Sequence, residues 1–145
     1  MPSVVKNKIV SYTAKQMYDL VNDIESYSAF VPFCVSSEIT QNNGDDELHA
    51  SLAFSFAGFH KSFITFNRLR PHKMIEIRLV DGPFKHLEGF WSFEEINDTQ
   101  CRVSLDMEFE FSSPILAITF GPMFNQITTQ LVDTFCERAK KVYGD

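Results

Sequence analysis

The chain has few cysteines, and none lies in a pattern that forms a metal site or a redox pair. Cys34, Cys101 and Cys136 are its three cysteines among 145 residues, and no two of them show a CxxC spacing. An odd number of well-separated cysteines argues against a disulfide scaffold and favours reduced thiols. Each lies among apolar residues, where a thiol packs as a small hydrophobe more often than it reacts.

Long apolar runs are also missing. No stretch approaches the roughly 20 apolar residues that a membrane-spanning helix needs. Residues 1–6 lack the apolar core and the small-residue cleavage site of a signal peptide. We therefore expect a cytoplasmic protein whose contact with lipid, if any, is peripheral.

Positive charge is in deficit, because 13 Lys and Arg face 19 Asp and Glu, which gives a formal net charge of −6. This balance disfavours a protein that holds phosphate backbones by nonspecific attraction. One basic group nevertheless gathers in and around an expected hairpin: Lys61, Arg68, Arg70, Lys73 and Arg78. It has two interpretations, a solvated sheet edge or a contact site for RNA or anionic lipid headgroups.

Patterns typical of catalysis or metal binding are absent as well. No G-x-S-x-G motif or glycine-rich phosphate loop occurs, and the acidic pairs Asp45–Asp46 and Glu94–Glu95 fall at expected turns or strand ends. We expect no metal site, no required cofactor and no catalytic residue. A metal site is not expected because the four histidines show no metal-ligand spacing along the chain: His49, His60, His72 and His86.

Phenylalanine, by contrast, is abundant: 15 Phe accompany one Trp and four Tyr. A Phe side chain supplies a large apolar area without a polar atom, so it suits a thick core or an apolar cavity. Core packing explains any single Phe, whereas the surplus points to a cavity.

The C-terminal stretch, residues 113–143, predicts a long amphipathic helix. Ser113 can cap it, Pro114 suits its first position, and Gly121-Pro122 predicts an early break. Gly144 is suited to ending it. The apolar side chains at helical spacing are Phe120, Phe124, Ile127, Leu131, Phe135, Ala139 and Val142. Such a stripe requires a broad apolar partner.

The N-terminal part predicts one strand and two short helices. Residues 4–10 form the expected strand, with Val5 as the candidate for its inner face. Thr13 and Gln16 match a capping box at the start of a helix of about three turns. Ser26 is the expected cap of a second, very short helix, which Pro32 stops.

From Phe33 onward the apolar period is two, which predicts strands. Turn residues at 42–46, 58, 71–73, 81–83 and 97–98 separate them. The expected strands are residues 34–41, 48–56, 59–69, 75–79, 87–93 and 103–111. Tight turns make this an antiparallel meander, and the terminal helix is the element long enough to cover its apolar face. The whole chain, 1–145, is thus expected to be one α+β domain with a curved sheet of about seven strands wrapped on the C-terminal helix.

This order of elements resembles the START-like (SRPBCC) helix-grip superfamily. Within it, residues 18–27 and 30–34 resemble the coenzyme Q-binding START-domain family, and the run 79–85, followed by Leu87, Gly89, Trp91 and Phe93, is the more specific match. The resemblance covers the chain from end to end. It extends to bacterial members known as ribosome-association toxins of the RatA type. The mitochondrial relatives carry a targeting extension that this sequence lacks, so the resemblance implies a bacterial cytoplasmic protein with any lipid contact peripheral at the inner membrane.

The resemblance and the apolar surplus imply three alternative functions. The first is non-enzymatic binding and transport of a ubiquinone-like polyisoprenoid lipid between sheet and helix, in support of respiration. The second is a toxin that binds the large (50S) ribosomal subunit and blocks subunit joining. The third, an aromatic polyketide cyclase, lacks an acid–base pair.

For the lipid site we predict twelve apolar side chains and three polar helix residues at its mouth. The apolar set is Phe54, Phe56, Ile77, Leu79, Trp91, Phe93, Met107, Phe109, Phe120, Phe124, Ile127 and Leu131. The polar set is Asn125, Thr128 and Gln130. The inner face of the strand at 59–69 stays ambiguous, because large apolar residues occur on both of its sides.

Overall fold

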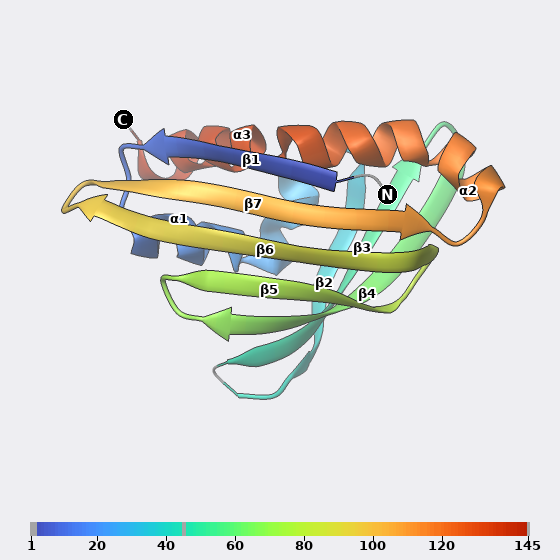
Figure 1. The fold of residues 1–145 in the computed structure, drawn as a ribbon, viewed down its shortest axis with the longest axis horizontal. Helices are drawn as coiled ribbons and strands as arrows, with labels where there is room; N and C mark the ends of the chain where they lie inside the picture. The colour runs from blue at the N-terminus through green and yellow to red at the C-terminus, as the bar shows by residue number, and fades with distance from the viewer. Residues whose placement is uncertain (1–2, 45, 145) are drawn as a thin grey trace.

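A computed structural model of the chain describes residues 3–44 and 46–144. Within them the chain forms seven strands, two α-helices after the sheet and two short helices after the first strand (Figure 1). The strands are β1 Ser3–Val10, β2 Cys34–Asn42, β3 Glu47–Phe56, β4 Phe59–Arg70, β5 Met74–Asp81, β6 Phe84–Asn97 and β7 Gln100–Phe111. The helices are α1 Ala14–Val21, the 3-10 helix η1 Ile24–Ala29, α2 Pro114–Thr119 and α3 Gly121–Tyr143.

All seven strands belong to one antiparallel sheet with the order β1-β7-β6-β5-β4-β3-β2. β1 therefore pairs with the last strand, and the meander from β2 to β7 follows the order of the chain. The sheet curls, so that β2, β3 and β4 pass behind the strands at the front of the view, and α3 runs along β1 and β7 (Figure 1). This arrangement is the predicted helix-grip fold.

The helix ends follow their predicted signals. The Thr13 hydroxyl accepts a hydrogen bond from the Gln16 amide, and the Gln16 side chain accepts one from Thr13. Ser113 caps α2, the helix breaks at Gly121, and Gly144 follows α3 with a φ of 82°. Among the described helices, none is long and apolar enough to cross a membrane.

The β3–β4 hairpin closes with a two-residue turn, because Phe56 pairs with Phe59. Both turn residues have positive φ, 51° at Ala57 and 85° at Gly58. This is the geometry of a type I′ turn, which suits the twist of paired strands and favours glycine. The longer predicted turn at 42–46 includes Asp45, which lies outside the described residues.

Three N- and C-terminal predictions are wrong in detail. Val4, not Val5, faces the core: Val4 is 3% exposed and Val5 69%, because Val4 pairs with Met107 on the inner face of β7. Ser26 does not cap η1, which begins two residues earlier, and its hydroxyl donates to Asp23 instead. Val142 is half exposed, although Ala139, one turn before it in α3, is fully buried.

The core lies between the concave face of the sheet and the helices. In β6 and β7 the inner residues pair directly, for example Trp91 with Leu105 and Leu87 with Phe109. All four are at most 3% exposed. α3 adds the large side chains of Phe124 and Phe135, and two aromatic rings of η1 and its end, Tyr27 and Phe30, pack against Phe135. These contacts leave the region over β3, β4 and β5 less tightly filled.

Candidate ligand-binding cavity

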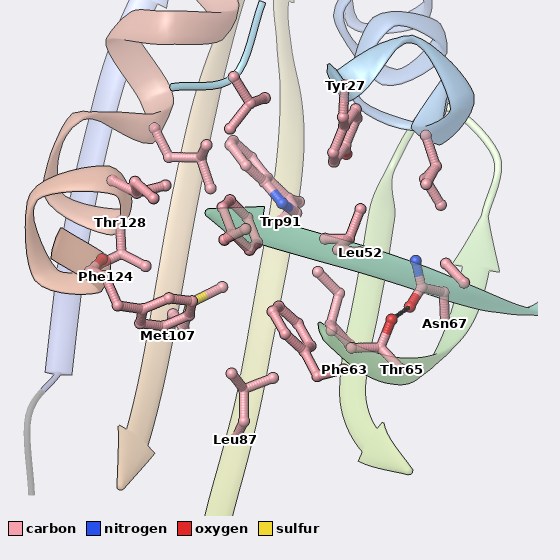
Figure 2. Close-up of a pocket in the computed structure, with 17 residues that line it drawn as sticks. Tyr27, Leu52, Phe63, Thr65, Asn67, Leu87, Trp91, Met107, Phe124 and Thr128 are labelled. Atoms are coloured by element: carbon pink, nitrogen blue, oxygen red, sulfur yellow. Dashed lines mark hydrogen bonds between the residues drawn. The ribbon is translucent and has the colours of Figure 1, made fainter. Parts of the chain in front are cut away.

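A cavity lies where the core is less tightly filled, between the concave face of the sheet, η1 and α3 (Figure 2). Its volume, counted as the space open to the centre of a water-sized sphere, is about 80 Å³. The lining residues are Ile24, Tyr27, Val31, Ala50, Leu52, Phe54, Phe63, Thr65, Asn67, Ile77, Leu87, Trp91, Met107, Phe124, Ile127, Thr128 and Leu131. Strands β3 to β7 supply the floor, and the two helices supply the roof.

The wall of the cavity is mostly hydrocarbon and aromatic carbon. A cavity of about 150 Å³ with such a lining stays dry and accepts benzene. The smaller space here holds a small apolar group, and it must widen to admit a ring or a chain. Four lining residues are partly exposed and mark where the wall is thin: Tyr27, Leu52, Ile77 and Leu131.

Most polar groups in the wall already have partners. The Thr128 hydroxyl, 2% exposed, donates to the Phe124 carbonyl oxygen at 3.0 Å, one turn back in α3. The Tyr27 hydroxyl donates to the Val21 carbonyl oxygen. Burial raises the pKa of Tyr27 above its ordinary value, with smaller contributions from Asp23 and Cys34, so this hydroxyl stays protonated.

An aromatic cluster continues from the cavity toward α2. The ring of Phe124 lies 4.8 Å from that of Phe109 and 5.0 Å from that of Phe84, measured between centroids. A smaller apolar pocket of about 20 Å³ lies in this cluster and shares Phe54, Phe63 and Phe124 with the larger cavity. Three phenylalanine side chains therefore border both spaces.

Seven of the twelve apolar residues predicted for the lipid site line the cavity: Phe54, Ile77, Trp91, Met107, Phe124, Ile127 and Leu131. Phe93, Phe109 and Phe120 are buried in the core outside it. Leu79 is partly buried, and Phe56 is 39% exposed at the β3–β4 hairpin, where it packs on Phe33. Phe120 instead lines the smaller pocket.

Of the three polar residues predicted for the mouth, Thr128 lines the cavity and the other two do not. Asn125 and Gln130 are exposed on the outer side of α3, and Thr128 is bonded within its own helix. The polar pair in the cavity is Thr65 and Asn67, which the sequence did not single out. Their row on β4 begins with Phe63 and ends with Leu69, and all four are buried. The alternation of these four residues with their neighbours could have identified the inner face of β4. It did not, because Ile64 and Phe66 give the other face apolar residues as well.

The predicted basic group is divided between two ends and two faces of the sheet. Lys61 lies near the start of β4 and at the rim of the smaller pocket, whereas Arg70 lies at the end of the strand. Nine residues of strand separate them by roughly 30 Å. Arg68 lies on the convex face with Arg70, where its Nε is 3.8 Å from Glu47. Arg78 pairs with Glu76 at 3.6 Å.

The sheet register assembles one cluster that spacing along the chain did not reveal. His86, Glu88 and Glu108 meet on the convex face of β6 and β7, with their ligand atoms within 4.8 Å of one another. The Nε2 of His86 lies 3.3 Å from a Glu108 oxygen and 3.6 Å from a Glu88 oxygen. The groups are half exposed, and their mutual contacts account for the arrangement.

The seven-stranded antiparallel sheet closed by a long C-terminal helix is the helix-grip fold of the START-like superfamily. Residues 10–136 match the family described as polyketide cyclase / dehydrase and lipid transport, and the chain belongs to that family. Solved structures share the fold. A crystal structure of a Thermus thermophilus protein superposes with a TM-score of 0.78 at 16% identity, covering 97% of this chain and 95% of the other. The 18 kDa Caulobacter crescentus protein gives 0.76 at 27%, with both chains fully covered.

Curated relatives place the chain more narrowly. The ribosome association toxin RatA of Vibrio cholerae is 42% identical over 145 residues and is covered completely, as is this chain. RatA of Escherichia coli K12 is 38% identical, over 99% of this chain and 90% of its own length. The mitochondrial coenzyme Q-binding protein COQ10 homolog B of Xenopus laevis is 26% identical, over 96% of this chain and 58% of its own. The chain is thus similar both to proteins named for ribosome association and to one named for quinone binding.

Proposed function

We propose that the protein binds an apolar lipid of the ubiquinone-like polyisoprenoid class in the cavity between sheet and α3, without chemical turnover. The observation that carries this proposal is the apolar cavity inside the fold, with Trp91 in its floor and Phe124 and Leu131 in its roof. Each buried CH₂ group contributes about 0.8 kcal/mol, so an isoprenoid tail gains free energy there without any polar contact. The family description, which includes lipid transport, and the coenzyme Q-binding relative support it.

The cavity lining also favours a binding protein over a cyclase. Among the described residues that line it there is no His, Cys, Asp, Glu, Lys or Arg. Tyr27 is the one titratable side chain among these described lining residues, and its hydroxyl already donates to the Val21 carbonyl oxygen. A general acid or base has no place at this site.

The lipid proposal is tested by extraction of the purified protein with organic solvent and mass spectrometry of the extract. We expect a co-purified isoprenoid quinone. Ala50→Leu brings three further carbons into the cavity, so it should leave the melting temperature unchanged or raised while the quinone disappears. Leu48→Met, at a core position outside the cavity wall, is the control and should retain the lipid. A lipid-free wild-type protein that also shows no thermal shift with short-chain ubiquinone refutes the proposal.

We further propose that the end of the molecule formed by α2 and the β3–β4 hairpin contacts a bilayer during exchange of the lipid. Ile115 and Ile118 are 72% and 74% exposed, and α2 has no buried residue. Phe59 at the hairpin is 47% exposed and packs on Phe120 at the α2–α3 junction, beside the smaller pocket. Apolar side chains of this kind insert at the headgroup boundary.

Flotation with vesicles of phosphatidylethanolamine and phosphatidylglycerol tests this contact. The double variant Ile115→Ser/Ile118→Ser should float less than the wild type. Val142→Ser removes an exposed apolar side chain at the opposite end of α3, roughly 30 Å away, and should not change flotation. Equal loss in both variants contradicts the assignment of the contact to α2.

Association with the large ribosomal subunit is the second candidate function. The observation that favours it is the name of the relatives at 38–42% identity over nearly the whole chain. We propose the convex face around Arg68 and Arg70 as the contact with ribosomal RNA. Arg70 is exposed at the β4–β5 turn beside Lys73, so local positive charge is present despite the net charge of −6.

Sedimentation with 50S particles tests the second candidate. Arg68→Glu/Arg70→Glu should release the protein into the supernatant at a salt concentration where the wild type pellets. Lys61→Glu changes charge on the same strand but at its other end and on its other face, so it should still pellet. If the wild type stays in the supernatant even at low salt, ribosome association is excluded.

A further inference from the structure

One hydrogen-bond donor in the cavity has no partner among the described residues. Thr65 and Asn67 lie on the inner row of β4, 4% and 5% exposed, among otherwise apolar wall residues. The Thr65 hydroxyl donates to the Asn67 side-chain oxygen at 2.9 Å. The Asn67 side-chain nitrogen, Nδ2, makes no hydrogen bond to any residue within 3–44 or 46–144.

The orientation of the Asn67 amide directs this nitrogen into the cavity. Figure 2 shows Nδ2 turned away from Thr65, toward the side of the cavity where Leu52 and Tyr27 lie. In this orientation the Thr65 hydroxyl engages the amide oxygen and leaves the nitrogen available as a donor. The nitrogen faces the space of the cavity, so an oxygen acceptor that enters this space can complete the hydrogen bonding of the amide.

We propose that Asn67 Nδ2 donates a hydrogen bond to a carbonyl oxygen of the bound lipid. This inference rests on the proposed lipid-binding function. It narrows the class of ligand to molecules with an oxygen acceptor at one end, such as a quinone, and excludes plain hydrocarbons. Because Asn67 is 5% exposed, the carbonyl end of the ligand lies inside the protein. The oxygen-bearing end of the ligand therefore lies in the cavity beside Asn67, and its apolar tail runs along Trp91, Phe63 and Leu131.

The neighbouring polar group provides a matched contrast. Thr128 lines the same cavity and is 2% exposed, but its hydroxyl already donates within α3. Loss of Thr128 therefore removes a polar group from the wall without removing a free donor. Only Asn67 should discriminate ligands by their carbonyl group.

The test compares two probes of similar length, a short-chain ubiquinone with a decyl tail and dodecylbenzene, which has no oxygen. Binding of the quinone is followed by quenching of Trp91 fluorescence, and binding of dodecylbenzene by its reversal of that quenching. The wild type should bind the quinone roughly tenfold or more tightly than the hydrocarbon, the effect of one buried hydrogen bond. Asn67→Leu should bring the two dissociation constants within about twofold of each other, whereas Thr128→Val should preserve the wild-type ratio.

The double variant Thr65→Val/Asn67→Leu guards against misfolding, because it leaves neither member of the pair unpaired. It should melt at or above the wild-type temperature and bind the two probes with similar affinity. A quinone preference that survives in both variants overturns the inference and leaves lipid binding intact, with a cavity water as the partner of Asn67. A wild type that binds neither probe overturns the proposed function itself.

Discussion

At the residue scale, the three cysteines show how the interior sets chemical reactivity. All three are free and buried, and burial raises the pKa of each. The shift is largest at Cys101, which is fully buried beside Cys136 and whose pKa rises from 9.0 to about 11. A thiol in such surroundings remains protonated and unreactive at neutral pH.

The Cys101 shift predicts a loss of stability at high pH. The thiol of the unfolded chain loses its proton near pH 9, while the folded protein retains it up to about 11. The unfolded state therefore binds fewer protons in this window, so this contribution to stability is complete below pH 9 and is lost as the pH rises toward 11. Thermal melts at steps of pH should show this decline, and Cys101→Ala should make it less steep. An identical pH profile in the variant would contradict the assignment to Cys101.

Gly82 predicts a second residue-scale effect. It has a φ of 157°, and a Cβ at this position would lie 2.4 Å from the Cβ of Phe63, which lines the cavity. Gly82→Ala should lower the free energy of unfolding by about 1–3 kcal/mol, because the strand carrying Phe63 must shift. Gly121→Ala is the control: its Cβ would meet nothing closer than 4.0 Å, so it should be neutral or stabilising in a denaturant titration. Similar losses in both variants would rule out the contact with Phe63 as the cause.

The single residues of the site were partly predictable. Trp91, Met107 and Leu131 follow from apolar period and end up in the wall of the cavity. Asn67 did not follow, because a polar residue in a strand signals the solvent face unless the neighbouring strands are known to cover it. Val5 was misplaced for a related reason: two consecutive valines leave the phase of a strand undefined.

At the element scale, the aromatic contacts of Phe124 anchor α3 to the sheet. Phe124 reaches the rings of β3, β4, β6 and β7, whereas α2, just before it, has no buried residue. The break at Gly121 therefore separates an anchored helix from an exposed one. Both the cap at Ser113 and the break were readable from sequence, because they depend on local backbone chemistry.

This contrast predicts opposite outcomes for two substitutions on either side of the break. Phe124→Ala should lower the free energy of unfolding by about 3–5 kcal/mol, because the cluster cannot collapse to fill the vacated ring. Ile118→Ala should change it by less than about 0.5 kcal/mol, since that side chain is exposed. Urea titration measures both. If Phe124→Ala were as mild as Ile118→Ala, the cluster could not be what anchors α3.

At the scale of the whole molecule, the order of the elements, together with the resemblance to a known superfamily, was enough to predict the fold. Antiparallel hairpins with short turns leave few topologies, and one long amphipathic helix was available to cover the sheet. The size of the cavity was not predictable, because it is the small difference between the sheet's curvature and the volumes of many side chains. The separation of the basic residues was not predictable either, because it depends on the face and the end of β4 that each residue occupies.

Trp91 allows a direct measurement of the central claim, that the interior admits an apolar guest. It is the one tryptophan of the chain, 1% exposed, in the wall of the cavity. Titration with short-chain ubiquinone should quench its fluorescence to a plateau in the wild type, with no saturable quenching in Ala50→Leu. Quenching that stays linear with quinone concentration in the wild type, or that saturates equally in Ala50→Leu, would show that the cavity is not the binding site.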